Sequence, residues 1–169
     1  MSDSEVSKEK ILASACLLGE CVRHDAERLR ITDQRIFQWG REKRFVPICP
    51  ECMAGMLVPR QPIEIEPGKT AQDVLNHQAR VMTKDGQDIT EDLLFGIEAA
   101  VGMAKRNHCR VALLKQNSPS CGTQRVYDGT FTGQKIDGMG LLAVLLKQEG
   151  IAVFDETQID QLQAALQAA

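Results

Sequence analysis

The sequence has few aromatic residues, no long apolar run and no strong excess of charge of either sign. Aromatic side chains make up 4% of the 169 residues, too few for a base-stacking surface along a nucleic-acid strand. The formal net charge of −3 produces no global field that would attract nucleic acid or an anionic membrane. The chain lacks the run of about eighteen apolar residues that a transmembrane helix needs. We therefore expect neither nucleic acid nor a membrane among its partners.

Two further signals are missing. The first ten residues, MSDSEVSKEK, hold no apolar segment of the kind found in secretory signals, so we expect a cytoplasmic protein in a reducing compartment. Neither a Walker sequence nor the glycine pattern of a dinucleotide-binding turn occurs. In a reducing compartment the six cysteines are not expected to form a disulfide framework, so they need another explanation.

Short apolar segments alternate with segments of helical spacing after a flexible lead-in, residues 1–9. The predicted strands are Ile11–Cys16, Arg44–Ile48, Arg80–Thr83, Val111–Leu114 and Ile151–Phe154, and the predicted helices are Asp33–Arg41, Glu91–Asn107, Leu141–Gln148 and Gln158–Ala168. Thr90 and Thr157 are expected to cap the second and the last helix, and residues 49–69 to form a long ordered loop. This alternation predicts that residues 10–169 form a single α/β domain, with a mostly parallel sheet and helices on both faces.

Three cysteines follow predicted strands, where open α/β sheets bind their ligands. Cys16 closes the first strand, Cys49 follows the second, and Cys121 lies in the loop after Val111–Leu114. Thiols from three strand ends can converge, and thiolate sulfur is the ligand of iron–sulfur clusters. With three protein ligands on a four-iron cluster, one iron stays open to a substrate. Cys109 precedes its strand and is expected at the opposite edge of the sheet.

The pair Cys49-Pro-Glu-Cys52 leaves two other interpretations open. A zinc site would need a second cysteine pair or histidines at ligand spacing, whereas the three histidines are scattered. A thioredoxin-type site would need a thiolate of low pKa at the start of a helix. Here the sequence predicts no clear helix after the pair, and Glu51 between the thiols disfavours a thiolate.

Five segments together resemble the thiouracil desulfidase family, in order from about residue 10 to residue 156. They are Ser14–Gly19 (SACLLG), Cys49–Glu51 (CPE), Pro59–Ile65 (PRQPIEI), Lys115–Gly122 (KQNSPSCG) and Tyr127–Phe131 (YDGTF). The resemblance implies a Rossmann-like α/β domain with a [4Fe-4S] cluster held by Cys16, Cys49 and Cys121. The fourth iron would accept sulfur from a thiolated pyrimidine. The chain departs from the family at residues 22–26, VRHDA, and its Cys21 and Cys52 stand where the family requires no cysteine.

The reaction that this resemblance implies is hydrolytic, from thiouracil and water to uracil and hydrogen sulfide. Glu51, next to a cluster ligand, is the expected acid/base residue, and Ser118 is the second expected catalytic residue. Asp25, Lys115 and Ser120 are expected to bind the substrate. Purely structural roles stay open as alternatives: the serines can form a turn, Asp25 can pair with a nearby arginine, and Lys115 can be a solvated residue at a strand end. Arg60 is expected to be an ion-pair partner that orders its loop.

Two other functions stay open beside the desulfidase. The first is a cluster-carrying protein that senses sulfide or thiolated bases without converting them, and the second is a zinc or thiol-redox protein. Thiolated tRNA is a less suitable substrate than a free base, because the chain has no concentrated basic stripe. The sequence predicts no particular oligomeric state.

Overall fold

The protein is built around a four-stranded parallel sheet. A computed structural model describes residues 8–19 and 33–168. The strands of the sheet, in spatial order, are β2 (Phe45–Ile48), β1 (Ile11–Ser14), β5 (Val111–Leu114) and β8 (Ala152–Asp155). Every neighbouring pair is parallel, so all four carboxyl ends meet at one edge of the sheet. In register, Ser14 at the end of β1 pairs with Ile48 at the end of β2.

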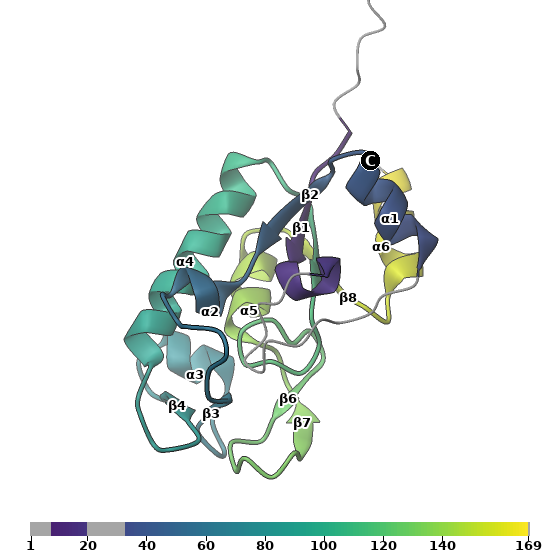
Figure 1. The fold of residues 1–169 in the computed structure, drawn as a ribbon. Coiled ribbons are helices and arrows are strands. Elements are labelled where there is room, and N and C mark those ends of the chain that lie inside the picture. Colours follow the sequence, from purple (N-terminus) through teal and green to yellow (C-terminus); the bar gives the residue numbers. More distant parts are fainter. Residues whose placement is uncertain (1–7, 20–32, 169) are drawn as a thin grey trace, which may run out of the picture.

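Helices cover both faces of this sheet (Figure 1). On one face lie α1 (Gln34–Arg41) and α6 (Ile159–Gln167), and on the other lie α4 (Thr90–Arg106) and α5 (Leu141–Gln148). Side chains of β1 alternate between the two cores, since Leu12 packs into the core under α4 and α5 while Ile11 and Ala13 pack into the core under α1 and α6. The predicted α/β fold, with a parallel sheet and helices on both faces, is confirmed.

Smaller elements gather beyond the carboxyl edge of the sheet. Strand β3 (Ile63–Ile65) pairs antiparallel with β4 (Val81–Thr83), and β6 (Arg125–Tyr127) pairs antiparallel with β7 (Lys135–Asp137). In Figure 1 both ribbons lie on the side toward which β1 runs. The short helices are η1 (Ala15–Leu18), α2 (Pro50–Met53) and α3 (Ala71–Leu75). Of these elements, η1, α2 and β6 contribute residues to the region where the cysteines were expected. Within the described residues, no helix combines the length and the apolar character that crossing a membrane requires.

Several sequence-based boundaries were wrong. The first strand ends at Ser14, and Cys16 lies in the 3-10 turn η1 that follows. The predicted loop over residues 49–69 contains both α2 and β3, elements so short that tertiary contacts rather than periodicity determine them.

The two predicted helix caps were also wrong. The Thr90 hydroxyl accepts the Val81 N–H at 2.9 Å and donates to Asp88 at 2.6 Å, so it is not available to cap α4. The Thr157 hydroxyl donates to Asp155 at 2.5 Å, and Gln158 occupies the cap position of α6. In both places a neighbouring carboxylate recruits the hydroxyl.

Candidate active site

A cavity of about 140 Å³ opens at the carboxyl ends of β1, β2 and β5. The structure places around it every predicted site residue that it describes, namely Cys16, Cys49, Cys121, Glu51, Ser118, Ser120 and Lys115. The remaining predicted residue, Asp25, lies outside the described residues, as does Cys21. Tyr127, Arg60 and Gln116 complete much of the wall. The cavity therefore collects side chains that are far apart in the sequence.

Cys49 is the single residue between β2 and α2, and this connection places it at the cavity. It occupies the cap position of α2 with an extended backbone, and Pro50 follows at the first helical position, where a missing N–H costs nothing. Helix α4 packs directly on this turn at Gly96. A Cβ at Gly96 would lie 2.0 Å from the Pro50 carbonyl oxygen, so only glycine permits this approach.

Cys121 lies in the loop between β5 and β6, and the start of α5 holds that loop. The N–H groups of Leu141 and Leu142 donate to the carbonyls of Pro119 and Ser120, both at 2.8 Å. Gly140 fits against the loop without a side chain, because a Cβ there would lie 2.6 Å from the Cys121 nitrogen. These contacts fix the backbone on one side of the cysteine.

The Cys121 thiol is buried next to other potential anions. Burial raises its pKa above the ordinary value, a hydrogen bond from Ser14 opposes this, and negative charge on Cys16 or Cys49 would raise it further. Ser118 supports the cysteine through its backbone, since its hydroxyl accepts the Cys121 N–H at 2.8 Å. Three thiols that disfavour each other's ionisation need a cationic centre before they can all become thiolates.

Cys49 and Cys52 lie together under the guanidinium of Arg60. Arg60 Nη2 is 3.9 Å from the Cys49 sulfur, and Arg60 Nη1 is 3.9 Å from the Cys52 sulfur. The pair lies at the single turn α2, which begins at Pro50 and ends at Met53, so no longer helix follows it. Burial raises the pKa of the Cys49 thiol to about 12. A thioredoxin-type site needs the opposite shift, so the structure does not favour that interpretation.

Glu51 points its carboxylate at Arg60 on one side and at Ser120 on the other. Arg60 contacts Glu51 Oε2 from Nε at 2.7 Å and from Nη2 at 2.5 Å. The Ser120 hydroxyl, only 2% exposed as a residue, lies 3.4 Å from Glu51 Oε1. The expected ion pair of Arg60 is present, and its role in ordering the loop stays a prediction.

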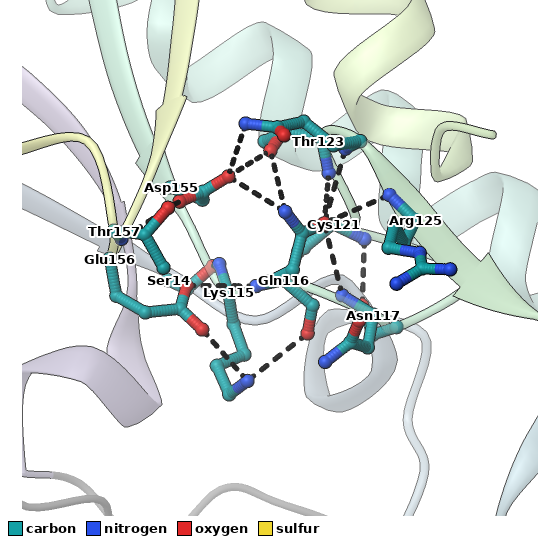
Figure 2. Close-up of polar contacts among 12 residues, drawn as sticks. Ser14, Lys115, Gln116, Asn117, Cys121, Thr123, Arg125, Asp155, Glu156 and Thr157 are labelled. Atoms are coloured by element: carbon teal, nitrogen blue, oxygen red, sulfur yellow. Dashed lines mark hydrogen bonds and ion pairs between the residues drawn. The ribbon is translucent and has the colours of Figure 1, made fainter. Parts of the chain in front are cut away.

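Lys115 directly follows β5, and its side chain pairs with the carboxylate of Glu156, the residue that follows β8 (Figure 2). Its Nζ lies 2.9 Å from Glu156 Oε1 and donates to the Gln116 carbonyl at 3.1 Å. Its own N–H donates to the Ser14 hydroxyl at 3.0 Å. Sequence reasoning missed Ser14 and Glu156. The signal that singled out the cysteines could have found them, because each lies at or just beyond the carboxyl end of a sheet strand.

The three cysteines suit a cluster better than a single ion. Within residues 8–19 and 33–168, no three His, Cys, Asp or Glu side chains are close enough to share one metal ion, as a structural zinc site requires. In an iron–sulfur cluster each thiolate binds a different iron, so the sulfurs stay apart around a common centre. Cys16, Cys49 and Cys121 around one cavity have that arrangement, which fits a [4Fe-4S] cluster.

Comparison with known proteins agrees with this geometry. Residues 11–158 match the model of a family described as 2-thiouracil desulfurase. A protein of Bacillus subtilis (strain 168), YbbK, is 40% identical over 152 residues, which cover 90% of this chain and 99% of that protein. The solved structure of the [4Fe-4S]-dependent thiouracil desulfidase TudS is 39% identical, with a TM-score of 0.86, and the match covers 96% of this chain and 100% of that one.

Proposed function

The chain belongs to the 2-thiouracil desulfurase family, and on that premise we propose that it is a [4Fe-4S]-dependent enzyme that removes sulfur from thiouracil. The reaction takes thiouracil and water to uracil and hydrogen sulfide. The carbon–sulfur bond of the exocyclic thiocarbonyl group breaks, a carbon–oxygen bond to the oxygen of water forms, and both protons of water leave with the sulfur as hydrogen sulfide. The observation that carries this proposal is the single cavity that Cys16, Cys49 and Cys121 share with the Glu51 carboxylate.

Cys16, Cys49 and Cys121 would hold the cluster. When bound, a cluster with only three cysteine ligands supplies an open iron that acts as a Lewis acid on the substrate sulfur. The protein contributes burial and fixed backbone at these ligands, since Cys16 is 8% and Cys121 5% exposed. Burial of these two side chains limits the access of bulk water to the ligand sulfurs.

Glu51 is the proposed acid/base residue, and its two oxygens have different tasks. Arg60 occupies Oε2, which leaves Oε1 as the oxygen that takes a proton from the attacking water. The Ser120 hydroxyl beside Oε1 orients this half of the carboxylate. A carboxylate fixed on one side and poised on the other is suited to moving a proton over a short distance.

Ser118 and Lys115 are the proposed contacts to the pyrimidine. The Ser118 oxygen accepts the Cys121 N–H, so its hydroxyl hydrogen is directed away from that amide and can be donated to a substrate atom. Lys115, braced by Glu156, presents a cation at the wall, where it can bind a carbonyl oxygen of the ring. The proposed substrate is a free base, since the chain has no concentrated basic stripe to bind a nucleic acid. Asp25 remains a prediction as a further substrate contact.

A reducing cytoplasm is the proposed location. Oxidation of the cysteine ligands would compete with cluster binding, so the site depends on a compartment that keeps thiols reduced. The proposed partner is the small thiolated base itself, and the function requires no macromolecular partner.

The decisive experiment joins metal analysis with turnover. Protein purified without oxygen is assayed for iron, acid-labile sulfide and zinc, and is then incubated with 2-thiouracil and with 4-thiouracil. We expect about four irons with matching sulfide per chain and equal amounts of uracil and hydrogen sulfide from at least one of the two bases. Stoichiometric zinc without sulfide, or a full cluster that yields no uracil from either base, would overturn the proposal.

A further inference from the structure

The Gln116 side chain connects the two ends of the loop that carries Cys121. Figure 2 shows its Oε1 facing a group of backbone amides at both ends of that loop. Oε1 accepts the N–H of Asn117 at 3.3 Å and, each at 3.1 Å, the N–H groups of Thr123, Gln124 and Arg125. Because these amides flank residues 118–122, one side-chain oxygen ties the beginning of the loop to its end.

The orientation of this amide is dictated by Asp155, at the end of β8. Asp155 is fully buried, and its Oδ2 accepts the Gln116 Nε2 group at 2.7 Å and the Thr123 hydroxyl at 2.6 Å. Its Oδ1 accepts the N–H and the hydroxyl of Thr157 at 2.8 and 2.5 Å. Backbone N–H groups can only donate hydrogen bonds, and four of them meet the other end of the Gln116 amide. The NH₂ of Gln116 must therefore face Asp155, and its oxygen must face the loop.

The loop is thus held from two sides. Gln116 gathers its amides on one side, while the N–H groups at the start of α5 bind its carbonyls on the other. Donor and acceptor groups of the loop are therefore engaged by different elements of the protein itself. A ligand that is already in place loses little conformational freedom when a metal group binds.

We propose that Gln116, oriented by the buried carboxylate of Asp155, is a positioning residue that presets the Cys121 ligand. This inference rests on the proposed function, in which Cys121 holds the cluster. The proposal depends on the direction of the hydrogen bonds of Gln116: its NH₂ group donates toward β8, and its oxygen accepts from the loop. Any change that inverts this polarity should loosen the ligand, even when the size of the side chain is unchanged.

Near-isosteric variants test this polarity. Gln116→Glu places an acceptor against the Asp155 carboxylate, and Asp155→Asn places a donor against the Gln116 amide. In the double variant Gln116→Glu/Asp155→Asn the new amide can donate to the new carboxylate, whose other oxygen still accepts the loop amides. Thr157→Val is the matched control, because it removes a hydroxyl from Asp155 on the side away from the loop.

The readout is the rate at which each protein loses its cluster to an iron chelator without oxygen, followed by visible absorption and iron content. Both single variants should lose it at least about tenfold faster than the wild type, the usual effect of removing a support of a metal ligand. Thr157→Val should stay close to the wild type, and the double variant should be slower than either single variant. Equal rates in all proteins, loss as fast in the control as in the single variants, or no rescue would overturn the proposal.

Amide hydrogen exchange of the wild type provides a test that needs no variant. We expect the amides of Thr123, Gln124 and Arg125 to be protected in the cluster-free protein as they are in the loaded one. Exchange at the rate of an unstructured peptide in the cluster-free protein would overturn the presetting of the loop. A wild type that binds no cluster but protects these amides would instead overturn the proposed function and leave the loop positioning supported.

Discussion

Arg60 holds one oxygen of Glu51 from two nitrogen atoms, at 2.7 and 2.5 Å, in a pair whose side chains are only 9% and 13% exposed. The same guanidinium lies 3.9 Å from the Cys49 sulfur. The proposed acid/base residue and a proposed cluster ligand are therefore located relative to each other by one planar, rigid cation.

Removing only Arg60 should lower the free energy of unfolding more than removing the charges of both Arg60 and Glu51. We expect Arg60→Ala to lower the free energy of unfolding by about 3–5 kcal/mol, since it leaves a nearly buried carboxylate unpaired. Adding Glu51→Gln to that variant should restore part of the loss. Urea denaturation of the cluster-free proteins measures both effects. Strictly additive losses would mean that the two side chains are not energetically coupled.

Glu51→Gln also separates an enzyme from a sensor. The amide keeps the size of the side chain but cannot take a proton, so turnover should fall by roughly 10²–10⁴ while iron and sulfide content stay unchanged. Glu149→Gln, at a surface carboxylate paired with Lys105, is the control and should keep full turnover. Binding and turnover of thiouracil are measured on the same anaerobic samples. Full turnover in Glu51→Gln would remove Glu51 from the mechanism.

The ligand assignment is tested by comparing cysteines. Serine at Cys16, Cys49 or Cys121 should prevent assembly of a stable four-iron cluster, because a hydroxyl is a poor ligand for these irons. Cys52→Ser is the informative control, since this thiol shares Arg60 with Cys49 but has no ligand role in the proposal. Iron and sulfide analysis after anaerobic reconstitution decides the matter. If Cys52→Ser loses the cluster while Cys121→Ser keeps it, the assignment is wrong.

Gly140 should tolerate no side chain. A Cβ there would lie 2.5 Å from the Ser120 carbonyl carbon, so Gly140→Ala should displace the Cys121 loop, lower stability by about 1–3 kcal/mol and reduce iron content. Gly40→Ala in α1 is the matched control, because a Cβ at Gly40 meets nothing within 4 Å and alanine favours a helix. Thermal unfolding and iron analysis of both variants make the comparison. Equal behaviour of the two variants would contradict the close packing at Gly140.

Cys109 predicts how stability depends on pH in the cluster-free protein. It lies just before β5, at the end of the sheet away from the cavity, and burial followed by the charge of Glu9 raises the pKa of its thiol from 9.0 to about 11. Between these values the unfolded chain releases the proton while the folded protein retains it, so stability falls as the pH rises from about 9 to about 11. Cys109→Ala should reduce that slope in urea denaturation. An unchanged slope would show that other groups cause it.

Strand order along the chain was enough to predict where the cysteines meet. Apolar runs such as Val111–Leu114 can be recognised in the sequence because each forms a fully buried strand. The carboxyl ends of neighbouring parallel strands lie at the same edge of the sheet. The prediction that Cys109 lies at the opposite edge followed from the same rule and is confirmed. The resemblance to a known family then implied which cofactor these cysteines hold and which reaction takes place there.

The contacts that orient the site could not be predicted in this way. Gln116 and Asp155 meet because β5 and β8 are neighbours, and no local pattern states which amide faces which carboxylate. Helix α2 has a single turn and depends on the bare surface of Gly96 in another helix. Such features arise from side chains brought together by the whole fold, whereas periodicity describes only a residue's near neighbours.

The order of the sheet has a consequence for how the chain stays folded. The proposed ligands follow β2, β1 and β5, which are consecutive neighbours, yet these strands are separated by long stretches of sequence. A cofactor bound to all three would act as a three-way cross-link that closes two large loops of the polypeptide. Closing such loops restricts the unfolded chain far more than the folded one. The group that performs the chemistry would then also stabilise the central sheet, and losing it to oxygen would lower the free energy of unfolding as well as abolish the activity.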